Sequence, residues 1–350
     1  MKKDIYILAI ESSCDETSFS IVKNGKFDIA TSISSQINIH KNYGGVVPEI
    51  ASREHLKNFI FILKEVLEKS KMSINDIDAI AVTYGPGLIG SLLVGVEVAK
   101  TLSLIYKKPL IAVNHMIGHI YSNNLNTNFV FPALILIVSG GHTDLVLMED
   151  HMKFKVIGST LDDAVGECYD KVARLMSLEY PGGPKIDKLS KSGKHSYNLP
   201  KPLQDFSCNF SFSGLKSAVL NLVNNENMKN HVIVKEDLAN SFQETIKEIF
   251  YSKIKNALNK YKVKAIYLAG GVSANSGIRE ITEKIAQEHN LIYSYPKMKY
   301  CTDNATMIGA AAYYYYINNK FVDINLKGVY NVMQGLVSLL LKSESASVIN

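Results

Sequence analysis

The sequence has 350 residues, of which 47% are hydrophobic and 20% charged, and its formal net charge is +5. These values are typical of a globular chain with two lobes, and the small basic excess permits nucleic-acid binding without requiring it. Four widely spaced cysteines argue against a disulfide framework and a cysteine-rich zinc cluster, and apolar runs such as 132–138 have strand length, so we expect a cytoplasmic protein with no membrane partner.

The first predicted elements form a β-hairpin that occurs twice in the chain. An apolar run at 7–10 leads into a small, polar turn at 11–17 and a second run at 19–22. The same order returns at 134–138, 139–144 and 145–147. Two such hairpins with small and acidic turns indicate an internal duplication.

A second repeated pattern follows each hairpin. Strand-like residues 79–82 precede a glycine loop at 85–90 and an apolar helix at 91–104. Likewise, residues 265–269 precede a glycine loop at 270–275 and a helix that continues to 285. A glycine loop at a helix N-terminus offers backbone N–H groups to a phosphate. The pattern therefore predicts a duplicated α/β protein that holds a nucleotide in a cleft between its lobes.

Periodic apolar positions predict further helices. Their ranges are 52–71, 162–178, 235–261 and 302–317. In the last of these, Thr302 or Asp303 is expected near the N-cap, because both residue types accept hydrogen bonds from free N–H groups there.

The segment His115-Met116-Ile117-Gly118-His119 follows an apolar strand-like run. On a helix, the two imidazoles would project from one face, as a transition metal requires of two ligands from one element. Asp303 could complete a two-histidine, one-carboxylate site, and His142 is another candidate for the third ligand. The alternative is that the histidines have only structural roles and that Asp303 is an N-cap.

Other polar positions suggest catalysis or substrate binding. The turn at 11–17 contains three acids, which could orient a magnesium-bound phosphate or act as a general base, or could be a solvated hairpin tip. Gly140 and Gly141 would allow close approach of a ligand. Gly183 and Asp187 could contact a ribose, although the same loop could simply separate two helices.

Nine motifs, in order from about residue 5 to residue 312, resemble those of the bacterial tRNA threonylcarbamoyladenosine transferase family, once misnamed a glycoprotein endopeptidase. The motifs occupy residues 11–17, 43–49, 85–88, 115–119, 138–143, 180–183, 210–216, 270–275 and 301–304. The set in order is much more specific than any single motif.

This resemblance implies an α/β fold of the actin/hexokinase/Hsp70-like (ASKHA) superfamily. It implies transfer of a threonylcarbamoyl group from threonylcarbamoyl-AMP to N6 of adenosine 37 in tRNAs that read ANN codons, with release of AMP. The implied partners are tRNA, a smaller paralogous subunit and a P-loop ATPase subunit.

The resemblance also implies roles for individual residues. The implied metal ligands are His115, His119 and Asp303, which would bind one divalent ion, Fe²⁺ first and Zn²⁺ second. Asp15 and Glu16 match acids implicated in activity. The implied substrate contacts are Ile137, Val138, Ser139, Gly140, Gly141, Asp170, Gly183, Asp187 and Asn275.

The expected division of the chain is a first lobe at 1–125, a second lobe at 126–325 and a divergent tail at 326–350, with a crossover of helices between the two halves left open. The tail lacks the arginine, tryptophan and proline with which the family usually ends, and the chain has no tryptophan. Contacts of the tail with tRNA or a partner therefore cannot be carried over from the family.

Three other functions compete with this one. A kinase or ATPase could use the same fold, because fold alone does not fix function. A metallopeptidase would have a glutamate beside the first histidine, where this chain has Met116. A non-catalytic partner subunit would be expected to lack the metal residues, which are present here.

Overall fold

The computed structural model describes residues 3–326, and the predicted tail lies outside this range from residue 327 onward. The chain forms two compact units, one made of Met1–Phe129 with the segment that begins at Pro296, and one made of Val130–Tyr295. Each unit contains one five-stranded mixed sheet. Residues 296–325, which the sequence-based division grouped with the second lobe, therefore lie in the first unit.

The sheet of the first unit has the strand order β3-β2-β1-β4-β5. Its strands are β1 (Tyr6–Glu11), β2 (Glu16–Lys23), β3 (Phe27–Ser35), β4 (Ala79–Gly85) and β5 (Leu110–Asn114). Strands β1, β2 and β3 pair antiparallel, whereas β4 and β5 continue the sheet in parallel from β1. The hairpin predicted at 7–22 is thus confirmed as β1 and β2, with Glu11 opposite Ser18.

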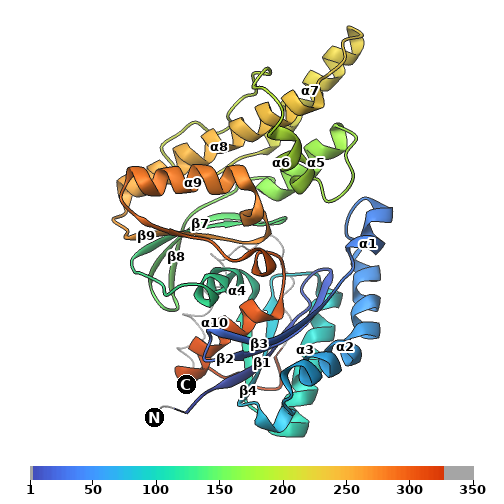
Figure 1. Cartoon of the computed structure of the whole chain (residues 1–350), viewed down its shortest axis with the longest axis vertical. Helices are drawn as coiled ribbons and strands as arrows, with labels where there is room; N and C mark the ends of the chain where they lie inside the picture. Colours follow the sequence, from blue (N-terminus) through green and yellow to red (C-terminus); the bar gives the residue numbers. More distant parts are fainter. Residues whose placement is uncertain (1–2, 327–350) are drawn as a thin grey trace. The chain divides into compact units, whose positions relative to one another are not determined.

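Helices cover both faces of this sheet (Figure 1). The covering helices are α2 (Pro48–Ser70), α3 (Ile89–Tyr106), α4 (His115–Tyr121) and α10 (Ala305–Ile317). The unit also has the short helix α1 (Ile37–His40) and 3-10 turns at Lys41–Tyr43, Ile74–Asp76, Ser122–Leu125 and Met298–Tyr300. Leu8 and Ile10 of β1 pack with α2 and α3, whereas Ala9 faces Gly309 of α10. A strand buried on both faces requires an unbroken apolar run, which explains the sequence of β1.

The second unit repeats the same sheet, with the order β10-β9-β6-β7-β8. Its strands are β6 (Ala133–Val138), β7 (Thr143–Asp150), β8 (Lys153–Ser159), β9 (Ala265–Ala269) and β10 (Ile292–Ser294). Again three antiparallel strands are followed by two parallel ones. The matching order and polarity of the two sheets confirm the duplicated α/β fold.

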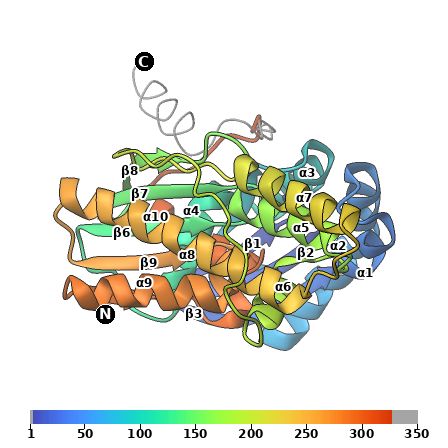
Figure 2. The same cartoon turned by 90° about the horizontal axis from the view of Figure 1, so that it is seen from above.

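The helices of the second unit pack on one face of its sheet and enclose its apolar core. They are α5 (Val165–Leu175), α6 (Gly183–Ser190), α7 (Ser213–Met228), α8 (Lys235–Lys260) and α9 (Ser276–Glu288), with a 3-10 turn at Gly271–Ala274. Figure 2 shows α8 and α9 side by side along the strands. Because β6 and β9 are adjacent and parallel, the turns that follow them lie at the same edge of the sheet.

One helix within the described residues, α3, is long and apolar enough to cross a membrane by length and composition. Its Leu92, Val96 and Ala99 are fully buried within the first unit. A core helix of this kind passes the same test as a membrane span, so α3 is weak evidence for one.

Candidate metal centre and glycine loops

Helix α4 brings the two predicted histidines together. Asn114 ends β5 and caps the helix, since its side-chain oxygen accepts hydrogen bonds from the N–H of Met116 at 2.8 Å and of Ile117 at 3.3 Å. His115 and His119 then lie one turn apart, with ring centroids separated by 4.6 Å. Both are buried, at 8% and 0% exposure.

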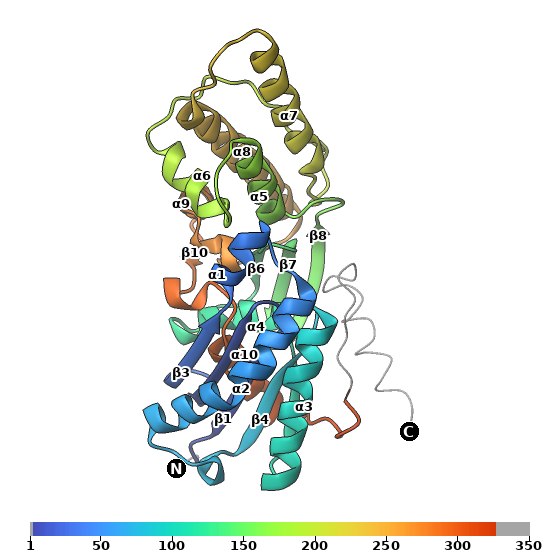
Figure 3. The ribbon, with the colours of Figure 1, turned by 90° about the vertical axis from the view of Figure 1, so that its right-hand side faces the viewer.

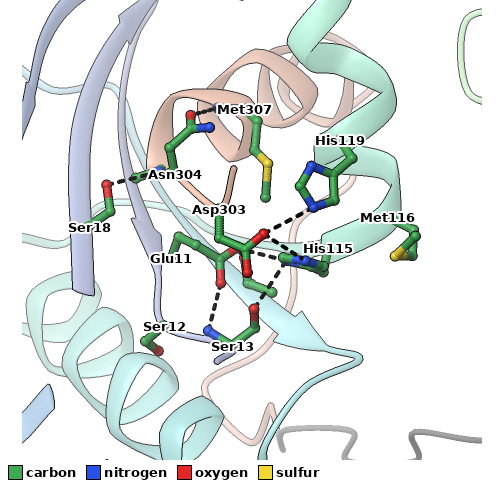
Figure 4. Close-up of polar contacts among 12 residues, drawn as sticks. Glu11, Ser12, Ser13, Ser18, His115, Met116, His119, Asp303, Asn304 and Met307 are labelled. Atoms are coloured by element: carbon green, nitrogen blue, oxygen red, sulfur yellow. Dashed lines mark hydrogen bonds and ion pairs between the residues drawn. The ribbon is translucent and has the colours of Figure 1, made fainter. Parts of the chain in front are cut away.

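The carboxylate of Asp303 reaches both imidazoles from the loop before α10 (Figure 4). Its Oδ1 lies 3.4 Å from Nε2 of His115 and 3.1 Å from Nε2 of His119. The expectation that Thr302 or Asp303 caps this helix is wrong, because Asn304 is the N-cap and accepts from Met307 N at 3.0 Å. The cap leaves the Asp303 side chain available to the histidines.

These three side chains suit a divalent metal ion. Their potential ligand atoms all lie within 4.8 Å of one another, and His142 is not a member of this group. Two atoms that bind one tetrahedral ion are about 3.3 Å apart, close to the spacings described above. Neither ring nitrogen of His119 has a hydrogen-bond partner among the described residues, because the 3.1 Å approach of Asp303 lacks hydrogen-bond geometry.

Glu11 contacts the other ring nitrogen of His115, the one that does not face Asp303 (Figure 4). The fully buried Glu11 carboxylate lies 3.1 Å from Nδ1 of His115. It also accepts hydrogen bonds from Ser13 N at 2.6 Å and Thr83 Oγ1 at 2.5 Å. A proton on Nδ1 directed at Glu11 leaves Nε2 as the nitrogen that faces Asp303, as is common for histidines that bind metals.

The sequence analysis placed Glu11 in the acidic turn but gave it no role of its own. The signal that could have identified it is its position as the last residue of a fully buried strand, where an ionised side chain needs a partner.

The electrostatics of this cluster shift the pKa values of the two histidines in opposite directions. Burial alone would lower the pKa of His115, but the carboxylates of Asp303 and Glu11 outweigh burial and raise it well above its usual value. Burial lowers the pKa of His119, and the charge of His115 acts in the same direction. Against the opposing effect of burial, the two histidines lower the pKa of Asp303. Of the two histidines, His115 therefore has the higher pKa in the metal-free protein.

Asp15 and Glu16 lie in the same unit, in the turn after β1 and at the start of β2. Asp15 is only 7% exposed, and Glu16 accepts a hydrogen bond from Ser35 Oγ at 3.1 Å. Burial, with the charges of Asp15 and Asp303, raises the pKa of Glu16 well above its usual value. A divalent cation at the cluster would oppose the effect of Asp303.

The two predicted glycine loops differ in what surrounds them. In the first unit, a Cβ on Gly87 would lie 2.5 Å from the carbonyl oxygen of Ser13, and Leu88 N donates to that oxygen at 2.7 Å. The loop at 85–90 is thus packed against the turn of the first hairpin. Gly87 allows that packing, and the N–H group of Leu88 is already bonded, so it is not free for a phosphate.

In the second unit, three glycines of the turn after β6 and of the loop after β9 are open. A Cβ on Gly140, Gly141 or Gly271 would meet no atom within 4 Å. Gly270 is the exception, since its φ is +88° and its Cα packs on the carbonyl of Val138. The turn after β6, which contains Ser139, and the loop after β9 therefore adjoin at one sheet edge and leave open backbone there.

Within the second unit, the side chains of three predicted substrate residues hold the backbone of the loop before Gly183 and of the start of α9. Asp170 accepts a hydrogen bond from Gly182 N at 2.7 Å, which fixes the loop before Gly183. Asp187 accepts from Ser276 Oγ at 2.6 Å and from Ser276 N at 3.2 Å, at the start of α9.

Asn275 caps α9 through Ile278 N and exchanges two hydrogen bonds with the side chain of Gln243, at 3.1 and 3.2 Å. Gln243 also accepts from Tyr169 Oη at 3.0 Å. The sequence analysis missed Gln243, because nothing in the pattern of α8 separates a buried glutamine from the other polar positions of that helix.

The chain matches the family described as tRNA N6-adenosine threonylcarbamoyltransferase over residues 29–310. Three curated relatives of that name come from Staphylococcus haemolyticus, Staphylococcus carnosus and Staphylococcus aureus. They are 52%, 51% and 49% identical to this chain, and the alignments cover 94–95% of it and 96–98% of the relatives.

Solved structures of lower identity share the fold. Full-length HypF in the phosphate- and nucleotide-bound form has a TM-score of 0.61 at 14% identity, covering 91% of this chain and 47% of HypF. Component A of the (R)-2-hydroxyglutaryl-CoA dehydratase of Acidaminococcus fermentans has a TM-score of 0.53 at 16% identity, with 89% and 98% covered. These likenesses agree with the ASKHA fold expected from the sequence.

Proposed function

Because the chain belongs to the family of tRNA N6-adenosine threonylcarbamoyltransferases, we propose that it transfers a threonylcarbamoyl group from threonylcarbamoyl-AMP to N6 of adenosine 37 in tRNAs that read ANN codons. AMP is the leaving group. The observation that carries the proposal is the cluster of His115, His119 and Asp303 in a chain of this family.

The exocyclic amine of adenosine is a weak nucleophile, because its lone pair is delocalised into the ring, so the carbamoyl carbon must be made more electrophilic. A divalent ion on His115, His119 and Asp303, Fe²⁺ in our proposal with Zn²⁺ as the substitute, would supply Lewis acidity at the carbamoyl oxygen. Glu11 orients the ring of His115 for this role through Nδ1.

The second unit binds the adenylate in this proposal. Backbone groups at Ser139, Gly140, Gly141 and Gly183, with the neighbouring strand residues Ile137 and Val138, would contact it. The proposal is supported by the open glycines and by the bracing of their loops by Asp170, Asp187 and Asn275. Backbone N–H groups fixed in this way stabilise the negative charge that develops on departing AMP.

Asp15 or Glu16 accepts the proton that N6 loses. A carboxylate with a raised pKa is a stronger base than an ordinary one, and the pKa of Glu16 is raised by burial and by nearby charges. Both acids are in the same unit as the metal cluster.

The proposed partners are tRNA, a smaller paralogous subunit and a P-loop ATPase subunit, and the proposed location is the cytoplasm. Support comes from membership of a tRNA-modifying family.

The proposal is tested by a single-turnover reaction of threonylcarbamoyl-AMP with a transcript of an ANN-decoding tRNA. The protein is assayed alone and with the two partner subunits, and nucleosides are measured by mass spectrometry. We expect the modified adenosine and one AMP for each transfer. If metal-loaded, folded protein forms no product under either condition but hydrolyses ATP without tRNA, the proposal fails and a kinase or ATPase function replaces it.

A further inference from the structure

Helix α6 and the loop that follows it carry a concentration of positive charge. Residues 185–201 contain five lysines and one histidine, with Asp187 as the single acid, whereas the whole chain has a net charge of only +5. This segment was not given a role in the chemistry described above, although Asp187 lies within it.

The structure turns the lysines outward and the nearby acids inward. On α6, Ile186 and Ser190 are buried, and Lys188 and Lys191 lie on the opposite, exposed side. Asp187 is engaged with Ser276, and it approaches Lys191 no closer than 3.9 Å.

The loop after α6 is held against the start of α8 by several hydrogen bonds. Asp237 accepts hydrogen bonds from Lys194 N at 2.8 Å and from Ser196 Oγ at 2.9 Å, so both of its carboxylate oxygens are bonded to the loop. Ser241 Oγ accepts from the backbone N–H groups of Ser196 and Tyr197. Gly193 packs directly on the backbone of Glu236, which brings the segments that carry Lys194 and Lys235 together.

We call the exposed lysines Lys188, Lys191, Lys194 and Lys235 the α6 lysine surface. Within residues 3–326, Lys188, Lys194 and Lys235 have no ion-pair partner. A second lysine-rich region of this unit is the groove between α8 and the loop at 201–206, where most lysines are paired: Lys201 with Glu248, Lys253 with Asp205, and Lys247 with Glu244 and Glu280. Within the described residues, this groove has one exposed lysine without an ion pair, Lys284, which lies over the ring of Tyr251, whereas the α6 lysine surface has three.

We propose that the α6 lysine surface binds the phosphate backbone of the substrate tRNA beside the adenosine that is modified. The inference rests on the proposed function, which requires an RNA next to the adenylate. Gly183 begins α6 and Asp187 is bonded to the start of α9, so the lysines adjoin two of the predicted adenylate contacts (Figure 3). Helix α6 is about 12 Å long, which is a distance of two or three RNA phosphates.

A braced lysine surface suits this partner better than a lone charged helix would. Each lysine that neutralises a phosphate releases counterions, so the affinity for RNA falls steeply with salt. Because the loop is already held in place by hydrogen bonds, binding does not incur the entropy cost of ordering it. Such contacts position the RNA without reading its sequence.

The test is tRNA affinity of the full-length protein over a range of salt concentrations, with Lys188→Glu/Lys194→Glu compared with Lys262→Glu/Lys264→Glu. The control pair changes the charge equally within the same unit, but it precedes β9, at the strand end opposite the glycine loop. We expect the first variant to lose about tenfold or more in affinity and its log–log salt slope to fall by about 1.5, whereas the control keeps both within about twofold.

Metal content, thermal midpoint and binding of a non-hydrolysable adenylate should be equal in both variants and the wild type. If Lys188→Glu/Lys194→Glu binds tRNA like the wild type while the wild type still forms product, the inference is overturned and the proposed function stands. Loss of binding to an acidic partner protein with unchanged tRNA affinity overturns it in favour of a protein interface. If the wild type itself neither binds tRNA nor modifies it, both proposals fail.

Discussion

At the scale of single residues, the arrangement around His115 decides what the cluster can do. Glu11 and Asp303 each contact one of its two ring nitrogens. The sequence indicated His115 and His119 as ligands through their helical spacing, and the resemblance to the family added Asp303. The sequence predicted Thr302 or Asp303 as the N-cap of α10, which is wrong, because the cap is Asn304, a residue type that caps helices equally well.

Removing the charge of Glu11 should weaken metal binding. Glu11→Gln keeps the size of the side chain but loses the charged acceptor for Nδ1 of His115, so we expect about a 10- to 100-fold loss of metal affinity. Competition with a chromophoric chelator measures this loss. Asp144→Asn is the matched control, because Asp144 is also a buried carboxylate but lies in the second unit. Equal metal affinity in Glu11→Gln and the wild type would contradict the role of Glu11.

The raised pKa of His115 gives metal affinity a definite pH dependence. A proton on His115 competes with the ion, so affinity should rise with pH until the folded-state pKa is passed, by at most about tenfold per pH unit. In the metal-free protein the sign for stability is opposite. The folded pKa is above the unfolded value of about 6.5, so the stabilisation is complete below that pH and is lost as pH rises through the folded pKa.

Two measurements check this pair of trends between pH 6 and 9, namely metal affinity by competition and the thermal midpoint of chelator-treated protein. His115→Asn serves as the control in the stability measurement and should flatten the trend. A metal affinity that falls as pH rises over this range would contradict the assignment of His115 as the protonated group.

A role for Asp15 or Glu16 in proton transfer predicts slow chemistry with normal substrate binding. Asp15→Asn or Glu16→Gln should reduce the single-turnover rate by about 100-fold, because general-base catalysis is lost while the side-chain shape is kept. The exposed Glu49→Gln on α2 is the control. Normal rates in both variants would exclude the two acids as proton acceptors.

At the scale of elements, the strongest patterns were predicted well and the weak ones were missed. Hairpins β1–β2 and β6–β7 and the helices α2, α3, α8 and α10 occur where apolar runs or helical spacing predicted them. Strand β3 was not predicted, because as a half-exposed edge strand it has a mixed burial pattern. The sequence offered no reason to separate the two glycine loops, since the atoms that crowd Gly87 belong to Ser13, a distant residue, and Gly271 has no such neighbour.

Alanine substitutions should separate these two kinds of glycine. Gly87→Ala would force a Cβ against the carbonyl of Ser13, so we expect a loss of about 1–3 kcal/mol in the free energy of unfolding. Gly271→Ala meets no atom within 4 Å, so stability should be unchanged while adenylate affinity falls. Denaturant unfolding and adenylate titration measure the two effects. If adenylate binding is normal in Gly271→Ala, that loop does not contact the ligand.

At the scale of the whole molecule, the first unit is made of two segments of the chain, and the whole second unit lies between them in the sequence. Helix α10 packs on β1, β2 and α4, and its Ala305, Met307 and Ile308 are fully buried. The duplication was visible in the sequence as two hairpins and two glycine loops. Whether the last helix returns to the first unit was left open, because an apolar helix near the end of the chain can pack on either sheet.

This connectivity predicts that the two units differ as isolated fragments. Val130–Tyr295 contains all of its core and should unfold cooperatively by circular dichroism. Residues 1–129 lack α10 and Asp303, so that fragment should lack fixed tertiary structure and bind metal weakly. A cooperative melt of fragment 1–129 would contradict the role given to α10.

The central claim is that His115, His119 and Asp303 hold the ion required for threonylcarbamoyl transfer. It is tested most directly by titrating chelator-treated protein with Fe²⁺ or Zn²⁺ and measuring the modified adenosine formed in a single turnover. The account predicts negligible product without metal, a rise to a plateau at one equivalent, and no rise in the Asp303→Ala variant. Full product formation by metal-free wild type would contradict it.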